Sequence, residues 1–394
     1  MKSLQTKVEL NYLKLLFFLF GFLIMSWVPR LPEVKANLGL SNGEFGSVIG
    51  TSAAGAVTAL LTVGHLVHNY GVKLVMRIAA FAMAMTLILL TSTHSTLIFL
   101  IGNIILAGAI SSFHISINAQ GFDYQDRTKS SVITRLSGFW STGALITAIA
   151  SGLLVNRIPL HIHITILSLV ILLIMLFAIS TMDSQLLKPN QDVEKDYKIT
   201  DIFKGFRIDG LVSGSLICAG FLEFAVGDWA AILVKEDVGI KSGLNTLPYI
   251  LFTFAMIVGR LSVHNLYSRF SIQFLVKLGS LVSGISFLIG ILAVRLIAPD
   301  KKILILLILC ISLTIAGLGS SFLAPSVMNI ANSRSRAPAS VVIGQLGVIN
   351  NIAVFVVRLI VAWIAQAFSL SIALIIPALL LFMVPYFSKI FKRA

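Results

Sequence analysis

Two acidic residues interrupt a long apolar stretch in the second half of the chain. Glu223 and Asp228 lie within residues 220–235, GFLEFAVGDWAAILVK, and we expect them to be the only carboxylates inside a hydrophobic span. A charge at the centre of a bilayer costs about 2.5–3.5 kcal/mol on insertion scales, so each of them needs a partner or a use. A carboxyl group in apolar surroundings can exchange a proton, which makes Glu223 the first candidate for proton coupling and Asp228 the second.

Arginines are the expected partners of these carboxylates. Arg30 lies near the end of the first apolar stretch, and we hypothesise that it pairs with Asp228 as a reversible gate; alternatively Arg30 contacts lipid phosphates and Asp228 meets water. Arg358, in a later apolar stretch, is expected to pair with Glu223 or Asp228, or to bind a carboxylate or hydroxyl groups of a ligand. On an ideal helix the two carboxylates are about 140° apart, so they share a face only if Gly227 lets the helix bend.

Polar and aromatic side chains recur at helical spacing elsewhere in the chain. Two sets each fall on one helix face, namely Gly347, Asn351 and Arg358, and Ser111, His114 and Asn118. His114 is a candidate for ligand or proton handling, with an interhelical hydrogen bond as the alternative. Trp27 and Trp140 can stack on a sugar ring, although tryptophan is also typical of membrane interfaces. Asn118 and Asn329 are candidate gate residues, and interhelical hydrogen bonding is their alternative role.

The composition is that of a multi-pass membrane protein. Of 394 residues, 57% are hydrophobic and 12% are charged, and the mean hydropathy is +0.96; a soluble domain has about 45–50% apolar and about 25% charged residues. The apolar runs are long and lack two-residue alternation, so we expect helices rather than a barrel. The net charge of +14 comes from basic residues scattered over short loops, which indicates a cytoplasmic excess of Lys and Arg and not a nucleic-acid partner.

Twelve membrane-spanning helices are predicted. Their approximate bounds are 12–34, 44–67, 74–92, 96–121, 133–156, 162–182, 206–235, 242–263, 271–295, 303–330, 339–365 and 368–390. With both termini in the cytoplasm, roughly two thirds of the Lys and Arg residues fall on the cytoplasmic side, which supports this orientation. The first span has no small-residue cleavage site before or after it, so we expect it to remain uncleaved.

The sequence repeats itself at about half its length. Three matches are in register: Gly21-Phe22-Leu23 with Gly220-Phe221-Leu222, Val34-Lys35 with Val234-Lys235, and Val67-His68-Asn69 with Val263-His264-Asn265. The longest polar stretch separates the two copies. We therefore predict an N-terminal six-helix bundle at 1–182, a cytoplasmic linker at 183–205 and a C-terminal six-helix bundle at 206–394, with the ligand site between the bundles.

Residues 64–73, GHLVHNYGVK, resemble the loop between the second and third helices of the major facilitator superfamily, roughly G-x-L-x-D-R-x-G-R-K. The positions that fit are Gly64, Leu66, Gly71 and Lys73. His68 stands where the family has Asp, and Asn69 stands where it has Arg. The second copy, at residues 259–264, has His264 in place of the Asp as well. In the family this loop latches the cytoplasmic side through charge pairing, so here the latch must work differently or depend on pH.

Further features are similar to a bacterial inner-membrane branch near the fucose permeases and the rhizopine-transport membrane proteins. They are Trp27-x-x-Arg30-x-Pro32, Asn118-x-Gln120, Phe139-Trp140-Ser141-x-Gly143 and Asp228-Trp229. The resemblance implies an all-α fold of twelve transmembrane helices in two pseudo-symmetric six-helix bundles. It also implies a secondary active transporter, not an enzyme, that moves a small polar solute such as a sugar or cyclitol by alternating access, coupled to protons.

Two other functions remain open at this point. One is a proton-driven exporter of drugs or metabolites, whose cavity would be more apolar. The other is a non-transporting membrane sensor or scaffold. The sequence contains no P-loop, GxGxxG, HExxH or CxxC motif, so we expect no cofactor and no metal. The expected partners are the solute, protons and membrane lipid, and the expected state is a monomer in the bacterial inner membrane.

Overall fold

The computed structural model describes residues 2–128, 132–182, 186–188, 209–267, 269–334 and 339–393. Within these ranges the chain is helical and has no strand, which confirms the predicted all-α class. Most of the predicted linker, residues 183–205, lies outside the described residues.

The number of membrane crossings follows from helix length. Eleven helical segments of the described chain are long and apolar enough to cross a membrane, and one of them, Asn42–Ser92, has 51 residues. At 1.5 Å per residue it would extend about 75 Å, more than twice the ~30 Å hydrocarbon core. It bends at Gly71, where φ is +78° and ψ is +160°, a conformation that is essentially restricted to glycine. Dividing the segment there gives the twelve predicted crossings.

The chain forms two compact units that do not follow the midpoint of the sequence. The first unit contains Met1–Val28 and Thr51–Gly205, and the second contains Pro29–Gly50 and Phe206–Ala394. A short segment from the first repeat therefore packs as part of the second unit.

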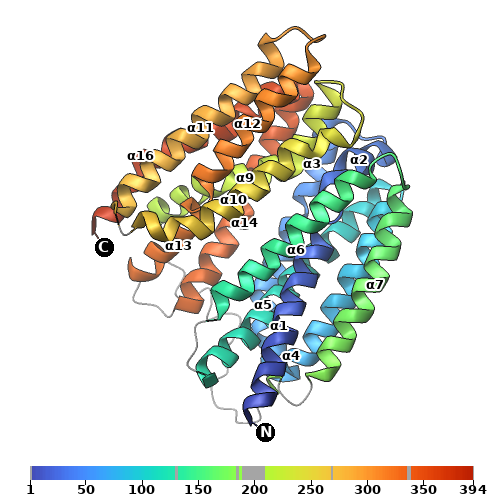
Figure 1. Cartoon of the computed structure of the whole chain (residues 1–394), viewed down its shortest axis with the longest axis vertical. Coiled ribbons are helices and arrows are strands. Elements are labelled where there is room, and N and C mark those ends of the chain that lie inside the picture. Colours follow the sequence, from blue (N-terminus) through green and yellow to red (C-terminus); the bar gives the residue numbers. More distant parts are fainter. Residues whose placement is uncertain are drawn as a thin grey trace. The chain divides into compact units, whose positions relative to one another are not determined.

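The first unit is built on close helix pairs. Its helices are α1 (Lys2–Ile24), α4 (Ser52–Ser92), α5 (Thr96–Thr128), α6 (Ile133–Leu154) and α7 (Leu160–Thr181). α1 packs along α6, and α4 packs along α5 and α7 (Figure 1). A Cβ atom at Gly21 of α1 would overlap the carbonyl of Trp140, and one at Gly143 of α6 would overlap the carbonyl of Phe18. Each helix thus places a glycine against the backbone of the other.

We expect Gly143→Ala to destabilise the first unit more than Gly138→Ala on the same helix. The added methyl group at Gly143 meets the backbone of α1, whereas no described atom lies within 4 Å of a Cβ at Gly138. Overpacking costs about 1–3 kcal/mol, while alanine in place of an unconstrained helical glycine gains about 0.5–1 kcal/mol. Thermal unfolding of the purified variants should place Gly138→Ala at or above the wild-type Tm and Gly143→Ala below it. Equal Tm values for the two variants would contradict the close crossing.

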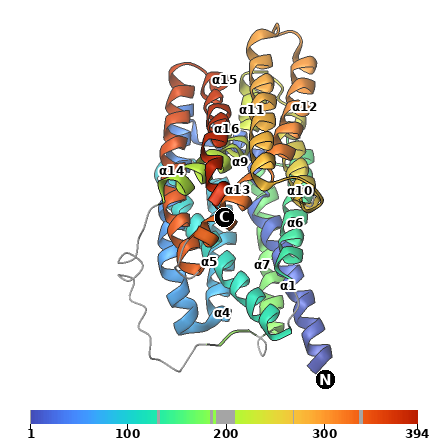
Figure 2. The same ribbon diagram turned by 90° about the vertical axis from the view of Figure 1, so that its left-hand side faces the viewer.

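The second unit contains the remaining helices. They are α2 (Leu31–Leu38), α3 (Asn42–Gly50), α9 (Gly210–Glu236), η2 (Gly243–Thr246), α10 (Leu247–Tyr267), α11 (Ile272–Leu296), α12 (Lys302–Ser320), α13 (Leu323–Arg334), α14 (Ala339–Ala367), α15 (Leu370–Ala373), α16 (Ile375–Phe387) and η3 (Ser388–Arg393). α11 lies beside α12 and α16 (Figure 2). α3 packs on α14, and α2 packs on α9.

The first predicted span, 12–34, is not one continuous helix. α1 ends at Ile24, and a 3-10 turn, η1 (Val28–Arg30), leads into α2. The cause is local: Pro29 has no N–H to donate to the carbonyl of Met25, four residues before it, and its ring would clash with that carbonyl in a continuous helix. Pro32 then occupies the first turn of α2, where its missing N–H has no helical partner to lose. The turn coincides with the boundary between the two units.

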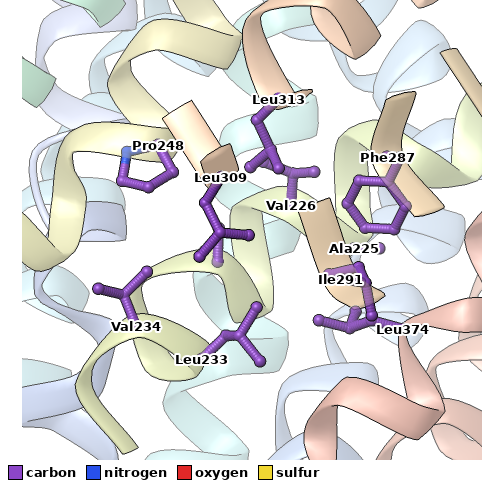
Figure 3. Close-up of a pocket in the computed structure, with 11 residues that line it drawn as sticks. Ala225, Val226, Leu233, Val234, Pro248, Phe287, Ile291, Leu309, Leu313 and Leu374 are labelled. Carbon is purple, nitrogen blue, oxygen red and sulfur yellow. The ribbon is translucent and has the colours of Figure 1, made fainter. Parts of the chain in front are cut away.

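A small apolar cavity lies inside the second unit. Eleven apolar residues line it, five of them on α9 (Figure 3), and its volume is about 10 Å³. That is about the space of one water molecule, and an apolar cavity of this size stays dry. It is a packing defect beside α9, and the candidate site is found elsewhere on that helix.

Candidate functional site

An ion pair joins α9 to α14 within the second unit. Arg358 Nη2 donates a hydrogen bond to Asp228 Oδ1 at 3.0 Å, and Arg358 Nε lies 2.7 Å from Asp228 Oδ2. The Nε–H is not aligned for a hydrogen bond, so this second contact is ionic. The Asp228 and Arg358 side chains are 13% and 15% exposed. Both helices are candidate membrane spans, where either charge would be costly without the other.

Phe224 supports the arginine from α9. The guanidinium carbon of Arg358 lies 5.0 Å from the centroid of the Phe224 ring, a distance at which a cation is attracted to the face of an aromatic ring. Phe224 precedes Asp228 by four residues, so both side chains lie on the same side of α9. Sequence analysis missed Phe224, although this spacing was available as a signal.

Glu223 has a different partner. Arg260 on α10 donates from Nη2 to Glu223 Oε2 at 3.0 Å, and from Nε to the carbonyl of Ser321 at 3.1 Å. The side chains of Glu223 and Arg260 are 50% and 35% exposed, so within its unit Glu223 is less buried than Asp228. Because Glu223 and Asp228 are five residues apart on α9, their side chains point in different directions, and they contact different helices, α10 and α14.

Arg30 pairs locally. It forms a two-pronged contact with Glu33, with Nε to Oε1 at 2.8 Å and Nη2 to Oε2 at 2.7 Å, and Arg30 itself is 1% exposed. The partner expected from the sequence was Asp228, whose carboxylate instead faces Arg358. The turn at η1 brings Arg30 directly before α2, and Glu33 lies within the first turn of that helix. A neighbour three residues away therefore takes the place of the distant partner.

Lys35 ties three helices of the second unit together. Its Nζ lies 2.7 Å from both carboxylate oxygens of Glu236, at the end of α9, and 2.5 Å from Oδ1 of Asn42, at the start of α3. Lys35 is 7% exposed. Burial raises the pKa of the adjacent Asp237, and the nearby charge of Glu236 acts in the same direction. In the sequence, Lys35 stood out only as part of the internal repeat.

Small residues let α3 lie close to α14. A Cβ atom at Gly43 would come 3.2 Å from Cβ of Gln366, and one at Gly46 would overlap Cβ of Ala362. The indole N–H of Trp363 donates to Ser47 Oγ at 3.1 Å. Residues 42–50 therefore form a tightly packed contact with the second half of the chain.

Glu9 is a buried carboxylate that sequence analysis missed. It is 1% exposed and lies in the candidate span Val8–Leu38, so the expectation that Glu223 and Asp228 are the only carboxylates within spans is wrong. Arg127 Nη2 lies 2.6 Å from Glu9 Oε1, and Gln120 Nε2 donates to the same oxygen at 3.0 Å. The error arose because Glu9 follows a polar N-terminal stretch and was placed outside the first span.

We expect Arg127→Ala to lower the Tm, because it leaves the buried carboxylate of Glu9 without its cation. Arg127 is 45% exposed, so solvent screening limits the loss to about 1 kcal/mol. Arg135→Ala, at an exposed position of α6, is the matched control and should leave the Tm unchanged. Adding Glu9→Gln to Arg127→Ala should restore part of the loss. No difference between the two arginine variants would contradict the role of this pair.

The other predicted residues of the first unit make local contacts. The Trp27 ring lies 6.3 Å from that of Phe99, and the His114 ring is stacked 6.0 Å from Phe20. Asn118 donates its amide to the carbonyl of His114 at 2.8 Å. The buried indole N–H of Trp140 has no hydrogen-bond partner among the described residues.

The remaining predicted residues belong to the loop motif and to the second unit. Gly71 forms the bend in α4, Gly64 and His68 are exposed, and Lys73 is half-buried. Asn351 donates to the carbonyl of Gly347 at 2.8 Å, within α14. The side chains of His264 and Asn329 lie outside the described residues.

Comparisons with known proteins identify the family. The profile of the Major Facilitator Superfamily matches residues 13–357. The chain is 23% identical over 381 residues to an uncharacterized MFS-type transporter of Yersinia pestis, covering 93% of this chain and 92% of that one. It is 21% identical over 289 residues to membrane protein MosC of Rhizobium meliloti, covering 71% and 67%. The crystal structure of the nucleoside transporter NupG is similar with a TM-score of 0.75 and 15% identity, covering 98% of this chain and 99% of that one. The chain therefore belongs to the Major Facilitator Superfamily of membrane transporters and is not an enzyme.

Proposed function

We propose that the protein is a secondary active transporter that moves a small polar solute across the bacterial cytoplasmic membrane by alternating access, with protons as the coupling ion. Membership of the superfamily supports transport itself. The observation that carries proton coupling is the Asp228–Arg358 pair, 13% and 15% exposed between two spanning helices. A proton on Asp228 removes its attraction to Arg358, and the released guanidinium can bind a carboxylate or hydroxyl groups of the solute.

The remaining candidates have supporting roles in this proposal. Glu223 is a second proton carrier, held by Arg260 until it is protonated. The solute contacts are Trp27, His114, Trp140 and Asn351, and the gate residues are Arg30, Asn118 and Asn329. Both termini lie in the cytoplasm, as the distribution of Lys and Arg favours, and the monomer is the working unit. Sugars and cyclitols are the first solute class to test.

The test is transport by purified protein in vesicles. A thermal-shift screen at two pH values, against sugars, cyclitols, amino acids and nucleosides, selects the solute. Nucleosides are included because the structural relative NupG is a nucleoside transporter. With an inward proton gradient we expect accumulation of the labelled solute above its external concentration, and a protonophore should abolish it. Uptake that stops at equal concentrations on both sides would refute proton coupling, and the absence of any flux would favour a sensor.

A further inference from the structure

The tenth predicted span is interrupted within the second unit. Lys302–Met328 is one candidate crossing, but α12 ends at Ser320 and α13 begins at Leu323. Pro325 explains the break, because a proline has no N–H for the carbonyl four residues before it and its ring displaces that carbonyl. The carbonyl concerned belongs to Ser321, which therefore lacks its usual donor within the helix.

Arg260 of α10 supplies a donor to this carbonyl. Its Nε donates to the carbonyl of Ser321 at 3.1 Å. Ser321 is 0% exposed, and a buried carbonyl needs a hydrogen-bond partner. The two helices are close at this point, since a Cβ atom at Gly259 would overlap Oγ of Ser321. A side chain from a neighbouring helix thus stabilises the break.

The same guanidinium also holds an acidic side chain. Arg260 Nη2 donates to Oε2 of Glu223, on α9, at 3.0 Å. A guanidinium is planar and presents its donors in a fixed arrangement, so a movement at one contact changes the other. Glu223 is 50% exposed and Arg260 is 35% exposed, whereas the carbonyl contact ends at a buried residue. Arg260 therefore connects an accessible carboxylate to the buried break in the tenth span.

A second side chain of α10 contacts the first turn of α13. Tyr267 lies 2.9 Å through its hydroxyl from Oγ of Ser326, and Ser326 Oγ donates to the carbonyl of Phe322 at 2.7 Å. The single hydroxyl hydrogen of Ser326 is used in that bond, so Tyr267 is the donor in the first. This contact involves no charge, so only the contact through Arg260 can respond to Glu223.

We propose that Arg260 is a positioning residue that links the negative charge of Glu223 to the proline break between α12 and α13. While Glu223 is negative, it holds the guanidinium at the carbonyl of Ser321 and keeps the break in its present geometry. Loss of that charge releases the guanidinium, and α13 then tilts more freely about the break. The link does not require that Glu223 carries a coupling proton, because any event that displaces the carboxylate has the same effect.

Hydrogen–deuterium exchange of the purified full chain, measured by mass spectrometry without solute or a proton gradient, tests the link. The readout is amide exchange in a peptide that covers residues 323–331, the first part of α13. Arg260→Gln should speed this exchange about tenfold, because a charge-assisted hydrogen bond to a buried carbonyl is lost. Glu223→Gln keeps a neutral acceptor for Arg260 and should speed the exchange about threefold.

Pro325→Ala separates the link from a general packing role of Arg260. Pro325 is exposed, and alanine at this position has the N–H that bonds to the carbonyl of Ser321 in a continuous helix. In the Pro325→Ala background, Arg260→Gln and Glu223→Gln should therefore leave the exchange of α13 unchanged. Equal increases with and without the proline would mean that Arg260 acts by packing alone, and would overturn the proposal.

Arg295→Gln is the matched control, because it removes an exposed arginine at the end of α11. It should exchange as the wild type does. If Arg260→Gln does not fold, Arg260→Lys keeps the charge without the planar fork and should speed exchange about threefold. Wild-type exchange in Glu223→Gln would also overturn the proposal, because the break would then not respond to that charge. None of these measurements depends on uptake, so a failure of proton coupling would leave their interpretation unchanged.

Discussion

Asp228→Asn and Arg358→Gln should each reduce proton-driven uptake to the level of empty vesicles. Asparagine keeps the size of Asp228 but cannot carry the proton. Glutamine at position 358 leaves a 13% exposed carboxylate without its cation, and an unpaired buried charge costs about 3–5 kcal/mol. Initial uptake rates in proteoliposomes with an imposed proton gradient measure both effects, with the folded fraction checked by size-exclusion chromatography.

Exchanging the two charges distinguishes the loss of the ion pair from a general loss of folded protein. Asp228→Arg combined with Arg358→Asp restores the pair in reverse, and we expect measurable uptake to return where both single changes abolish it. Phe224→Leu keeps the pair but removes the aromatic face that lies 5.0 Å from the guanidinium, and it should weaken solute binding with a smaller effect on maximal rate. Wild-type pH dependence in Asp228→Asn would exclude Asp228 as the coupling group.

Glu223→Gln is the comparison on the same helix. Its carboxylate is 50% exposed and its partner Arg260 is 35% exposed, so water already competes for both charges and the change should be milder. If Glu223→Gln removes the pH dependence and Asp228→Asn does not, the roles that we propose for the two acids are reversed.

The fold was predictable because a membrane restricts the backbone structures that an apolar stretch can adopt. Long apolar runs must be helices, and their number follows from their length. The long candidate span Asn42–Ser92 was divided correctly because Gly71, where α4 bends, belongs to a recognisable loop motif. The first span was predicted as unbroken because hydropathy does not register the effect of Pro29 on backbone geometry.

The charged residues were easier to find than their partners. Asp228 and Arg358 both stood out as charges in apolar runs, but their pairing depends on how two helices are rotated. Lys35 and Glu236 meet from positions 201 residues apart, and no local pattern predicts such a contact. The pairing of Arg30 with Glu33 was within reach of sequence analysis, since an i, i+3 pair is a local feature, yet the more distant hypothesis was preferred.

A disulfide between α3 and α14 should stop transport, and its reduction should restore transport. The residues are chosen from the close contact of Gly43 with Gln366, where the two Cβ atoms would be 3.2 Å apart. A disulfide needs about 3.5–4.5 Å, so a small adjustment suffices in Gly43→Cys with Gln366→Cys. The native thiols, Cys218 and Cys310, are both buried and do not compete. Uptake is measured after oxidation and again after reduction.

The expected loss follows from how the chain is connected. Pro29–Gly50 packs in the second unit, but it is continuous with α1 and α4 of the first, so the alternating access that we propose would open this contact during each cycle. Each single-cysteine variant, treated with the same oxidant, should transport normally. Lys35→Gln removes the ionic contact with Glu236. The contact between α3 and α14 should then open more readily, and the disulfide should form more slowly. Full transport by the cross-linked protein would mean that residues 29–50 move as a fixed part of the second unit, and it would contradict an opening between α3 and α14 during transport.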